Sequence, residues 1–275
     1  MLSKTRFQTL LAFTRKKERA SQGRFFVEGW RWLEEALALP TPPECVLVAE
    51  DAPRSASEET LLARARAVAR EYHEATPKQL ARLTESATPP GVAALVPWAP
   101  ATQLPRRSLA PGPRLLVALD AVADPGNAGT IIRTADWFGA SGVLMGDRCV
   151  EASNSKLIRS TMGSLFHLPI VRAGTLLSEF QGLRESGYTV VGASLTGEAL
   201  PGFTWPQRTV LVIGNEANGI QPDVAAALDL GVRIPSHGRA ESLNAGIAAA
   251  VLMADWRARG VPPGEMEMQP DLSER

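Results

Sequence analysis

Short apolar runs alternate with helically spaced stretches throughout the C-terminal two thirds of the chain. This pattern predicts strands at 114–119, 142–146, 168–172, 188–194, 209–213 and 231–234. It predicts helices at 127–138, 155–162, 175–186, 221–228 and 242–258. Apolar strands that alternate with helices indicate an α/β fold, with a parallel sheet that helices cover on both faces.

The N-terminal part shows a similar alternation on a smaller scale. It predicts helices at 5–20, 30–39, 58–70 and 77–83, and strands at 25–27, 45–49 and 92–96. Five prolines between 97 and 113 then exclude a helix or an inner strand there. We therefore expect a small α/β domain at 1–97, an extended linker at 98–113, a larger domain at 114–260 and a fraying tail at 261–275.

Charge is balanced over the whole chain but not along it. Lys and Arg number 29, as do Asp and Glu. Residues 1–24, called the basic segment below, nevertheless carry seven cations against the single acid Glu18. Such a segment suits contact with phosphates, although a solvated helix face has the same composition.

The cysteines and histidines of the sequence give no sign of a disulfide or a metal site. Cys45 and Cys149 lie far apart, and neither they nor the three histidines show metal-ligand spacing. We therefore expect a reduced protein without disulfides or metal. No signal peptide and no apolar run of membrane-spanning length is visible, so a cytoplasmic location is expected.

Three polar segments follow predicted strands. After 114–119 come Asn127 and Arg133, which have ordinary readings as a helix N-cap and a solvated helix residue. After 209–213 comes a loop with two glycines, 214–219, that lets backbone approach a ligand. After 231–234 comes a polar loop, and Ser242-Leu243-Asn244 is expected to open the last helix. A helix N-terminus of this kind suits a polar ligand, or is simply capped.

Together these segments resemble the three motifs of the SpoU (TrmH-type) RNA ribose 2′-O-methyltransferases of the SPOUT class. The matching patterns are N-x-G-x-x-x-R, G-N-E-x-x-G and I-P-x-x-x-x-x-E-S-L-N, in this order over roughly 113–260. Since all three occur in one chain, each at a strand end, the combination is specific. The resemblance, and not the periodicity, implies a trefoil knot in the parallel-sheet domain.

A second resemblance covers the N-terminal part. Lys17, residues 24–29 and residues 90–92 are similar to the substrate-binding domain that precedes many SpoU domains, which has a ribosomal-protein-like RNA-binding fold. Residues 155–166 also resemble the SpoU family. The implied RNA-binding residues are Arg15, Lys16, Lys17, Arg19, Arg24 and Arg159.

The family resemblance implies S-adenosylmethionine as cofactor. Its expected binding residues are Ser194, Leu195, Gly214, Asn215, Glu216, Gly219, Ile234, Ser242, Leu243 and Asn244. The expected catalytic residues are Arg133, Asn127, Glu216, Ser242 and Asn244. Arg133 is the family's usual activator of the 2′-hydroxyl. A guanidinium keeps its proton at neutral pH, so we assign it instead to phosphate binding and oxyanion stabilisation. An RNA phosphate oxygen or a water then remains as the base.

Other functions stay open on the sequence. A dinucleotide-dependent oxidoreductase would need G-x-G-x-x-G after the first strand of its sheet, and that motif is absent. The remaining alternatives are a transfer RNA ribose methyltransferase and a non-catalytic RNA-binding protein; the extra domain favours ribosomal RNA. The resemblance also implies a homodimer through the small-residue helix at 242–258, with Arg133 acting near the partner's cofactor.

Overall fold

A computed structural model describes residues 1–50, 54–84 and 90–259, and the chain in it forms two compact units. Unit 1 comprises Met1–Pro100 together with Glu151–His167. Unit 2 comprises Ala101–Val150 and the residues from Leu168 onward. The tail expected at 261–275 lies outside the described residues.

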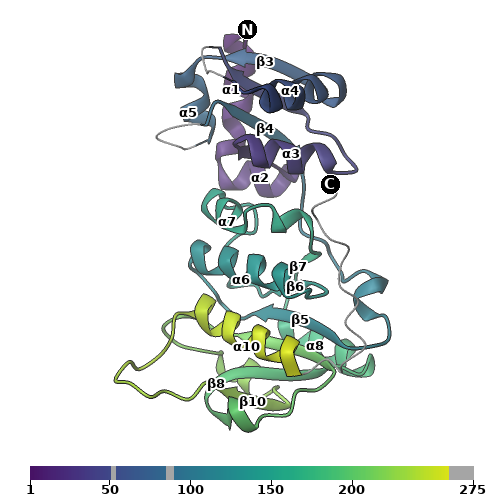
Figure 1. Ribbon diagram of the computed structural model, residues 1–275, viewed down its shortest axis with the longest axis vertical. Helices are drawn as coiled ribbons and strands as arrows, with labels where there is room; N and C mark the ends of the chain where they lie inside the picture. The colour runs from purple at the N-terminus through teal and green to yellow at the C-terminus, as the bar shows by residue number, and fades with distance from the viewer. Residues whose placement is uncertain (51–53, 85–89, 260–275) are drawn as a thin grey trace. The chain divides into compact units, whose positions relative to one another are not determined.

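Unit 1 is built on a four-stranded sheet in the order β1-β4-β2-β3 (Figure 1). The strands are β1 (Arg24–Glu28), β2 (Cys45–Ala49), β3 (Glu71–Ala75) and β4 (Val92–Pro97). The helices are α1 (Lys4–Leu11), α2 (Lys16–Gln22), α3 (Trp30–Ala38), α4 (Ala56–Val68) and α5 (Pro77–Thr84). All residues of β2 are buried, as its uninterrupted apolar sequence predicts.

Two elements of unit 1 differ from the sequence prediction. The helix expected at 5–20 breaks into α1, a short 3₁₀ turn (Ala12–Thr14) and α2, because Arg15 adopts an extended conformation with ψ 133°. The strand β3 was missed, since its sequence Glu-Tyr-His-Glu-Ala lacks apolar alternation. This strand lies at the sheet edge and pairs in parallel with the buried strand β2, which supplies the order that its own sequence does not.

Unit 2 contains the predicted parallel sheet, in the order β10-β8-β9-β5-β6-β7. Its strands are β5 (Arg114–Leu119), β6 (Val143–Met145), β7 (Ile170–Arg172), β8 (Thr189–Ala199), β9 (Arg208–Ile213) and β10 (Leu230–Arg233). Every recorded pairing within it is parallel. The strand β8 runs five residues beyond its expected end at 194.

Helices cover both faces of this sheet, as predicted. They are α6 (Pro125–Trp137), α8 (Leu176–Glu185), α9 (Pro222–Ala225) and α10 (Ala245–Arg259). Leu116 and Val210 point into a core with Phe180 of α8. Thr209 lies on the other face, where Trp256 Nε1 of α10 donates to its hydroxyl at 3.2 Å. The helix α10, yellow in Figure 1, packs against α6.

Residues 151–167 lie between β6 and β7 in sequence but pack within unit 1. They carry α7 (Ser155–Thr161), which packs against β1. The ring of Phe166 stacks on Phe25 at 6.3 Å and meets Trp32 edge-on at 5.5 Å. Two segments distant in sequence therefore build unit 1, whereas the sequence pattern had assigned 151–167 to the second part of the chain.

The proline-rich connection is more ordered than an extended linker. Ala101 forms a parallel bridge with Val171 beside β7, and Arg106–Leu109 form a short 3₁₀ helix. Tyr188 donates its hydroxyl to the carbonyl of Ser108 at 2.6 Å. Among the described residues, no helix has both the length and the apolarity needed to cross a membrane.

Candidate active site

The three motif segments follow strands β5, β9 and β10 and meet at the carboxyl-end edge of the sheet of unit 2. The chain runs outward from β5 through β6 to β7, and later fills the other side with β8, β9 and β10. The order therefore reverses between β5 and β9. Ligands of open α/β sheets bind in the crevice outside the strand ends at such a point. The loops after β5 and β9 flank it directly.

The first motif enters α6 through an N-cap that differs from the expected one. Asp124, not Asn127, is the N-cap, and its carboxylate accepts the N–H of Asn127 at 2.8 Å. Pro125 at the first helical position was the sequence signal for this, because proline is favoured directly after the cap. The N-cap reading of Asn127 was thus wrong, and its amide side chain is available for contacts outside the helix.

Asn127 joins the three motif loops. Its Nδ2 donates to Glu216 Oε1 at 2.7 Å, and its Oδ1 accepts from Nδ2 of Asn244 at 2.9 Å. Glu216 follows β9 and Asn244 precedes α10. These partners lie 89 and 117 residues from Asn127 in sequence. The structure thus brings together three of the five expected catalytic residues.

The last helix begins later than expected. It starts at Ala245, and Asn244 caps it by accepting the N–H groups of Gly246 at 2.9 Å and Ile247 at 3.3 Å. Ser242 and Leu243 therefore lie in the preceding loop, where both are exposed. The Oδ1 of Asn244 accepts the capping hydrogen bonds, and its Nδ2 donates to Asn127. These bonds connect the start of α10 to the start of α6.

The loop after β9 is a closed, glycine-dependent turn. Asn215 and Gly219 exchange two backbone hydrogen bonds of 2.9 Å. Gly219 has φ +68°, and a Cβ added there would meet open space. A Cβ on Gly214 would instead lie 2.3 Å from the carbonyl carbon of Gly219. The Asn215 carboxamide accepts the N–H of Ala217 at 3.0 Å, which stiffens the turn further.

Arg133 stands apart from this network. It lies on α6, is exposed, and makes no side-chain hydrogen bond or ion pair to another residue that the structure describes. Its guanidinium is therefore available for an anionic ligand. Ser242, the fifth expected catalytic residue, is exposed in the loop that extends before α10 (Figure 1).

The remaining expected cofactor residues lie around the same strand ends. Ser194 and Leu195 are part of the long strand β8, and the Leu195 side chain is 71% exposed. Ile234 directly follows β10. The two strands come very close here, since a Cβ on Gly197 would lie 2.3 Å from the carbonyl carbon of Gly231.

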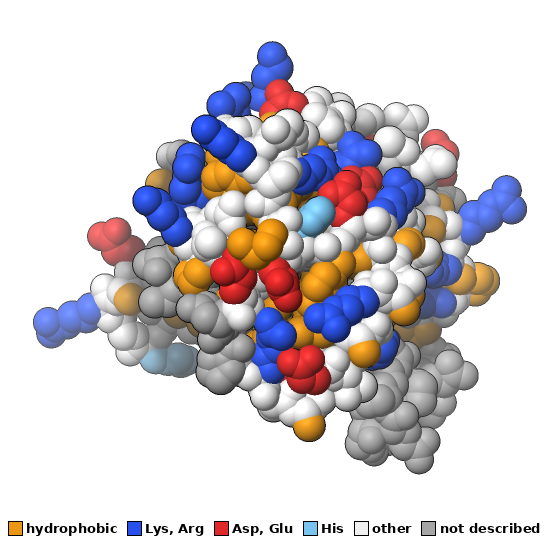
Figure 2. Space-filling view, turned by 90° about the horizontal axis from the view of Figure 1, so that it is seen from above, with side chains coloured by type: hydrophobic (Ala, Val, Ile, Leu, Met, Phe, Trp, Pro, Cys, Tyr) orange, Lys and Arg blue, Asp and Glu red, His pale blue; other side chains and the backbone are white. Residues whose placement is uncertain are grey.

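The expected RNA-binding residues of the basic segment separate into two kinds. Arg15, Lys16 and Lys17 are exposed. Arg19 is only 8% exposed, and its guanidinium donates to Thr14 O at 2.6 Å and approaches Glu151 at 3.4 Å. Figure 2 shows Lys and Arg side chains along one edge of the face it presents. Arg19 therefore fits a role in holding α2, while the three exposed cations fit phosphate contact.

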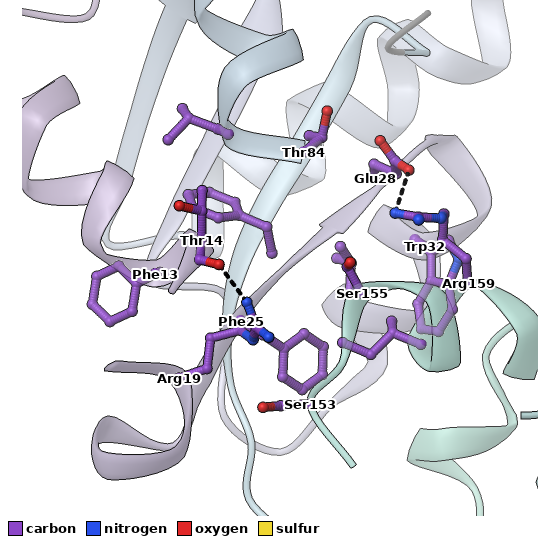
Figure 3. A pocket seen from close by; sticks show the side chains of 14 residues that line it. Phe13, Thr14, Arg19, Phe25, Glu28, Trp32, Thr84, Ser153, Ser155 and Arg159 are labelled. Atoms are coloured by element: carbon purple, nitrogen blue, oxygen red, sulfur yellow. Dashed lines mark hydrogen bonds and ion pairs between the residues drawn. The ribbon is translucent and has the colours of Figure 1, made fainter. Parts of the chain in front are cut away.

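The other two expected RNA-binding residues are paired with carboxylates. Arg24 Nε lies 2.7 Å from Glu44 Oε2, and Arg159 Nη1 lies 3.5 Å from Glu28 Oε1. The Arg159 side chain is still 41% exposed. It lies beside a cavity of about 20 Å³ between β1 and α7, which Arg19, Glu28 and Ser153 also line (Figure 3). A cavity of this size holds about one water, and it is too small for a nucleoside.

One group of potential metal ligands exists among the described residues, although the sequence spacing had suggested none. Cys45, Glu71 and His73 place their ligand atoms within 4.8 Å of one another. They lie on the paired strands β2 and β3, and the grouping was missed because β3 was missed. Arg6 occupies both oxygens of Glu71, at 2.8 and 2.9 Å. Burial raises the pKa of the Cys45 thiol to about 12. The ion pair with Arg6 already engages the Glu71 carboxylate, which does not favour a metal ion there.

Comparison with known families matches both parts of the chain. Residues 114–254 match the SpoU rRNA Methylase family, and residues 4–94 match the MRM3-like substrate binding domain. A curated relative from Bacillus subtilis (strain 168) is the 23S rRNA (guanosine(2553)-2′-O)-methyltransferase RlmP. It is 35% identical over 88% of this chain and 92% of its own length.

Solved structures agree with these matches. The SpoU methyltransferase AviRb from Streptomyces viridochromogenes, in complex with AdoMet, superimposes with a TM-score of 0.82 at 31% identity, over 93% of this chain and 98% of that one. An AdoMet-bound rRNA methyltransferase from Sinorhizobium meliloti gives a TM-score of 0.81 at 30% identity, over 94% and 97%. The motif loops, the sheet that carries them and these similarities lead to one conclusion: this chain belongs to the SpoU rRNA methylase family.

Proposed function

We propose that this protein transfers a methyl group from S-adenosylmethionine to a ribose 2′-hydroxyl, most fittingly in ribosomal RNA. The observation that carries the proposal is the hydrogen-bonded set Glu216–Asn127–Asn244, which joins the three SpoU motifs at one sheet edge. The named activities of RlmP and of the AdoMet-bound relatives support it. A ribosomal RNA substrate also fits the cytoplasmic location expected from the sequence.

The described residues fit the cofactor. The missing side chain of Gly214 lets the turn at 214–219 close on itself, and Gly219 leaves open space in which backbone groups can approach a nucleoside. The exposed side chains of Leu195 in β8 and of Leu243 in the loop before α10 offer apolar surface for a purine ring. S-adenosylmethionine supplies an electrophilic methyl group, and its transfer needs no metal. The trefoil knot that the family resemblance implies for this domain stays part of the proposal.

In this proposal the protein orients the reactants and stabilises charge. Asn127, Ser242 and Asn244 position the ribose and the cofactor, and Glu216 orders the turn by accepting from Asn127. Arg133 stabilises the oxyanion that develops as the 2′-hydroxyl loses its proton. Because its guanidinium stays protonated, the proton passes to a phosphate oxygen of the RNA or to a water.

Calorimetry and methylation mapping test the function. The purified protein should bind S-adenosylmethionine with an unchanged affinity when a chelator is present. A deletion strain should lose one ribose methylation in ribosomal RNA and regain it on complementation. Loss of a transfer RNA methylation would support the transfer RNA alternative instead. Cofactor binding without any lost methylation would favour a non-catalytic RNA-binding protein.

The basic segment should contribute RNA affinity and not chemistry. Replacing Arg15, Lys16 and Lys17 with Gln should weaken RNA binding and flatten its salt dependence, because each lost phosphate contact lowers the log–log slope by roughly 0.7–0.9. Turnover at saturating RNA should stay unchanged. Filter binding over a range of salt concentrations measures the slope. The same charge change at the exposed Arg64, Arg70 and Lys78 is the control, and an equal effect there would contradict a specific role.

A homodimer is the assembly that the surface of unit 2 supports best. Three large apolar side chains are exposed on the adjoining helices α6 and α10: Trp137 (84%), Ile247 (52%) and Val251 (38%). Ile247 and Val251 are four residues apart and share one face of α10. Trp137 follows Arg133 by one turn of α6. Three small residues of α10, Ala245, Gly246 and Ala249, are buried within the subunit, and a Cβ on Gly246 would meet Thr130 at 3.2 Å.

Subunit mixing tests whether a dimer shares its sites. Arg133→Ala and Asn244→Ala should each lose most of their activity alone, and mixed heterodimers should regain part of it if Arg133 serves the partner's cofactor. Gel filtration should give a dimer at micromolar concentration, and Trp137→Glu should shift it toward monomer. A fully active monomer would contradict the proposal.

A further inference from the structure

A buried carboxylate lies at the centre of the candidate site without belonging to any of its motifs. Asp120 directly follows β5 and is 6% exposed. Its backbone N–H continues the ladder to Ile213 of β9 at 2.8 Å. Its Oδ2 accepts the N–H of Gln221 at 2.6 Å. Gln221 lies 101 residues away in sequence, at the end of the turn that follows β9.

The next residue, Ala121, makes a second hydrogen bond to the same segment. Ala121 has φ +55°, a left-handed conformation that a residue with a Cβ adopts only when its surroundings impose it. In this conformation its carbonyl oxygen accepts from Asn215 Nδ2 at 2.9 Å. Asn215 stands at the entry of the turn and Gln221 at its exit. The two consecutive residues Asp120 and Ala121 therefore hold both ends of the segment 214–221.

Ile220 of the segment packs against the core of unit 2, and the other contacts are made by exposed side chains. Glu216 reaches Asn127, and Oε1 of Gln221 accepts from Arg148 Nη1 at 3.0 Å. Both contacts lie at the surface, where water competes for the same groups. The bond of Asp120 is shielded, and its acceptor is a carboxylate, so it should contribute more to fixing the turn.

The geometry points to Asp120 as a positioning residue of the cofactor site: it fixes the exit of the 214–221 turn and so keeps that turn in the shape that holds the cofactor. It touches no reacting atom. The inference rests on the proposed function, because it assigns the turn to S-adenosylmethionine. Removal of the acceptor should raise the KM for the cofactor and leave kcat at saturating cofactor nearly unchanged.

Two substitutions of Asp120 separate the acceptor from the charge. Asp120→Asn keeps an oxygen that can accept the Gln221 N–H. Burial raises the pKa of the Asp120 carboxyl, so a neutral side chain is tolerated there. Asp120→Ala removes the acceptor. We expect calorimetry to show that Asp120→Ala weakens S-adenosylmethionine binding roughly tenfold or more, while Asp120→Asn stays near the wild type.

A matched pair at the donor tests the same bond from its other end. Gln221 has φ −60° and ψ 147°, angles that proline also adopts. Gln221→Pro therefore fits the backbone angles but replaces the N–H with a Cδ that faces the Asp120 carboxylate, and Gln221→Ala removes the side chain alone. Proline should reproduce the loss of affinity seen with Asp120→Ala, and alanine should not. This pair also decides the matter if Asp120→Ala fails to fold.

Asp147→Ala is the control for a general charge effect, because Asp147 is an exposed carboxylate on the loop after β6. Normal affinity in both Asp120→Ala and Gln221→Pro would overturn the proposal, as would an equal loss in Asp147→Ala. Amide hydrogen exchange at Gln221 gives a readout without cofactor. Asp120→Ala should speed this exchange, and an unchanged rate would show that Asp120 does not hold the Gln221 N–H. A wild-type protein that binds no S-adenosylmethionine would refute the proposed function, while the exchange experiment would still test Asp120.

Discussion

Arg133→Ala is expected to lower the methylation rate by about 10²–10³, the usual cost of removing one contact to a developing oxyanion. The side chain is exposed on α6 and engages no other described residue, so its removal disturbs neither the core nor the hydrogen-bonded set around Asn127. Affinity for S-adenosylmethionine should remain nearly intact. Single-turnover methylation of the RNA and calorimetry with the cofactor measure the two effects separately.

Two further variants sharpen the test of Arg133. Arg133→Lys keeps the positive charge but loses the forked guanidinium, so an intermediate rate is expected. Arg172→Ala removes another arginine of unit 2, at the end of β7, and should leave the rate unchanged. Near-normal turnover of Arg133→Ala would show that this residue is only a solvated part of the helix.

Gly214→Ala is expected to abolish useful cofactor binding. The new Cβ would lie 2.3 Å from the carbonyl carbon of Gly219 and from the nitrogen of Ile220, so the backbone of the turn must move. Overpacking of this kind typically costs about 1–3 kcal/mol, and a clash with backbone lies at the upper end. If this free energy destabilises the conformation of the turn that binds the cofactor, the affinity for S-adenosylmethionine drops roughly 100-fold.

Substitutions of two other glycines, Gly219 and Gly238, serve as comparisons for Gly214→Ala. Gly219→Ala meets open space but must adopt φ +68°, which costs roughly 1–2 kcal/mol, so a smaller loss is expected. A Cβ on Gly238, in the loop before α10, has no heavy atom within 4 Å and should be neutral. Equal affinities for all three variants, measured by calorimetry, would show that the 214–219 turn does not hold the cofactor.

The sequence by itself determined the elements whose signals are local. The strands β2, β5 and β9 are continuous apolar runs because helices or other elements cover both of their faces, so their positions could be read without any partner. The alternation of such strands with amphipathic stretches gave the α/β class, which the structure confirms. The spacing of polar residues after three strands gave the family, which the comparisons confirm.

Tertiary contacts decided the features that no local pattern encodes. The strand β3 has a polar sequence and exists because the edge of β2 pairs with it. Residues 151–167 have an ordinary helical pattern, yet the aromatic contacts of Phe166 with Phe25 and Trp32 bring them into unit 1. Hydrophobic periodicity predicts that one face of a helix is buried, but it does not predict which element that face packs against.

The same division separates the residues of the site. Motif spacing pointed to Asn127, Glu216 and Asn244, but the hydrogen bonds that join them span 89 and 117 residues and depend on the order of the strands. Arg19 looked like Lys17 in the sequence, and only packing shows that it is buried beside Thr14 and Glu151. The sequence thus determined which chemical groups follow which strands. The tertiary structure decided which of them meet, because contacts between distant residues form only once the sheet has set their positions.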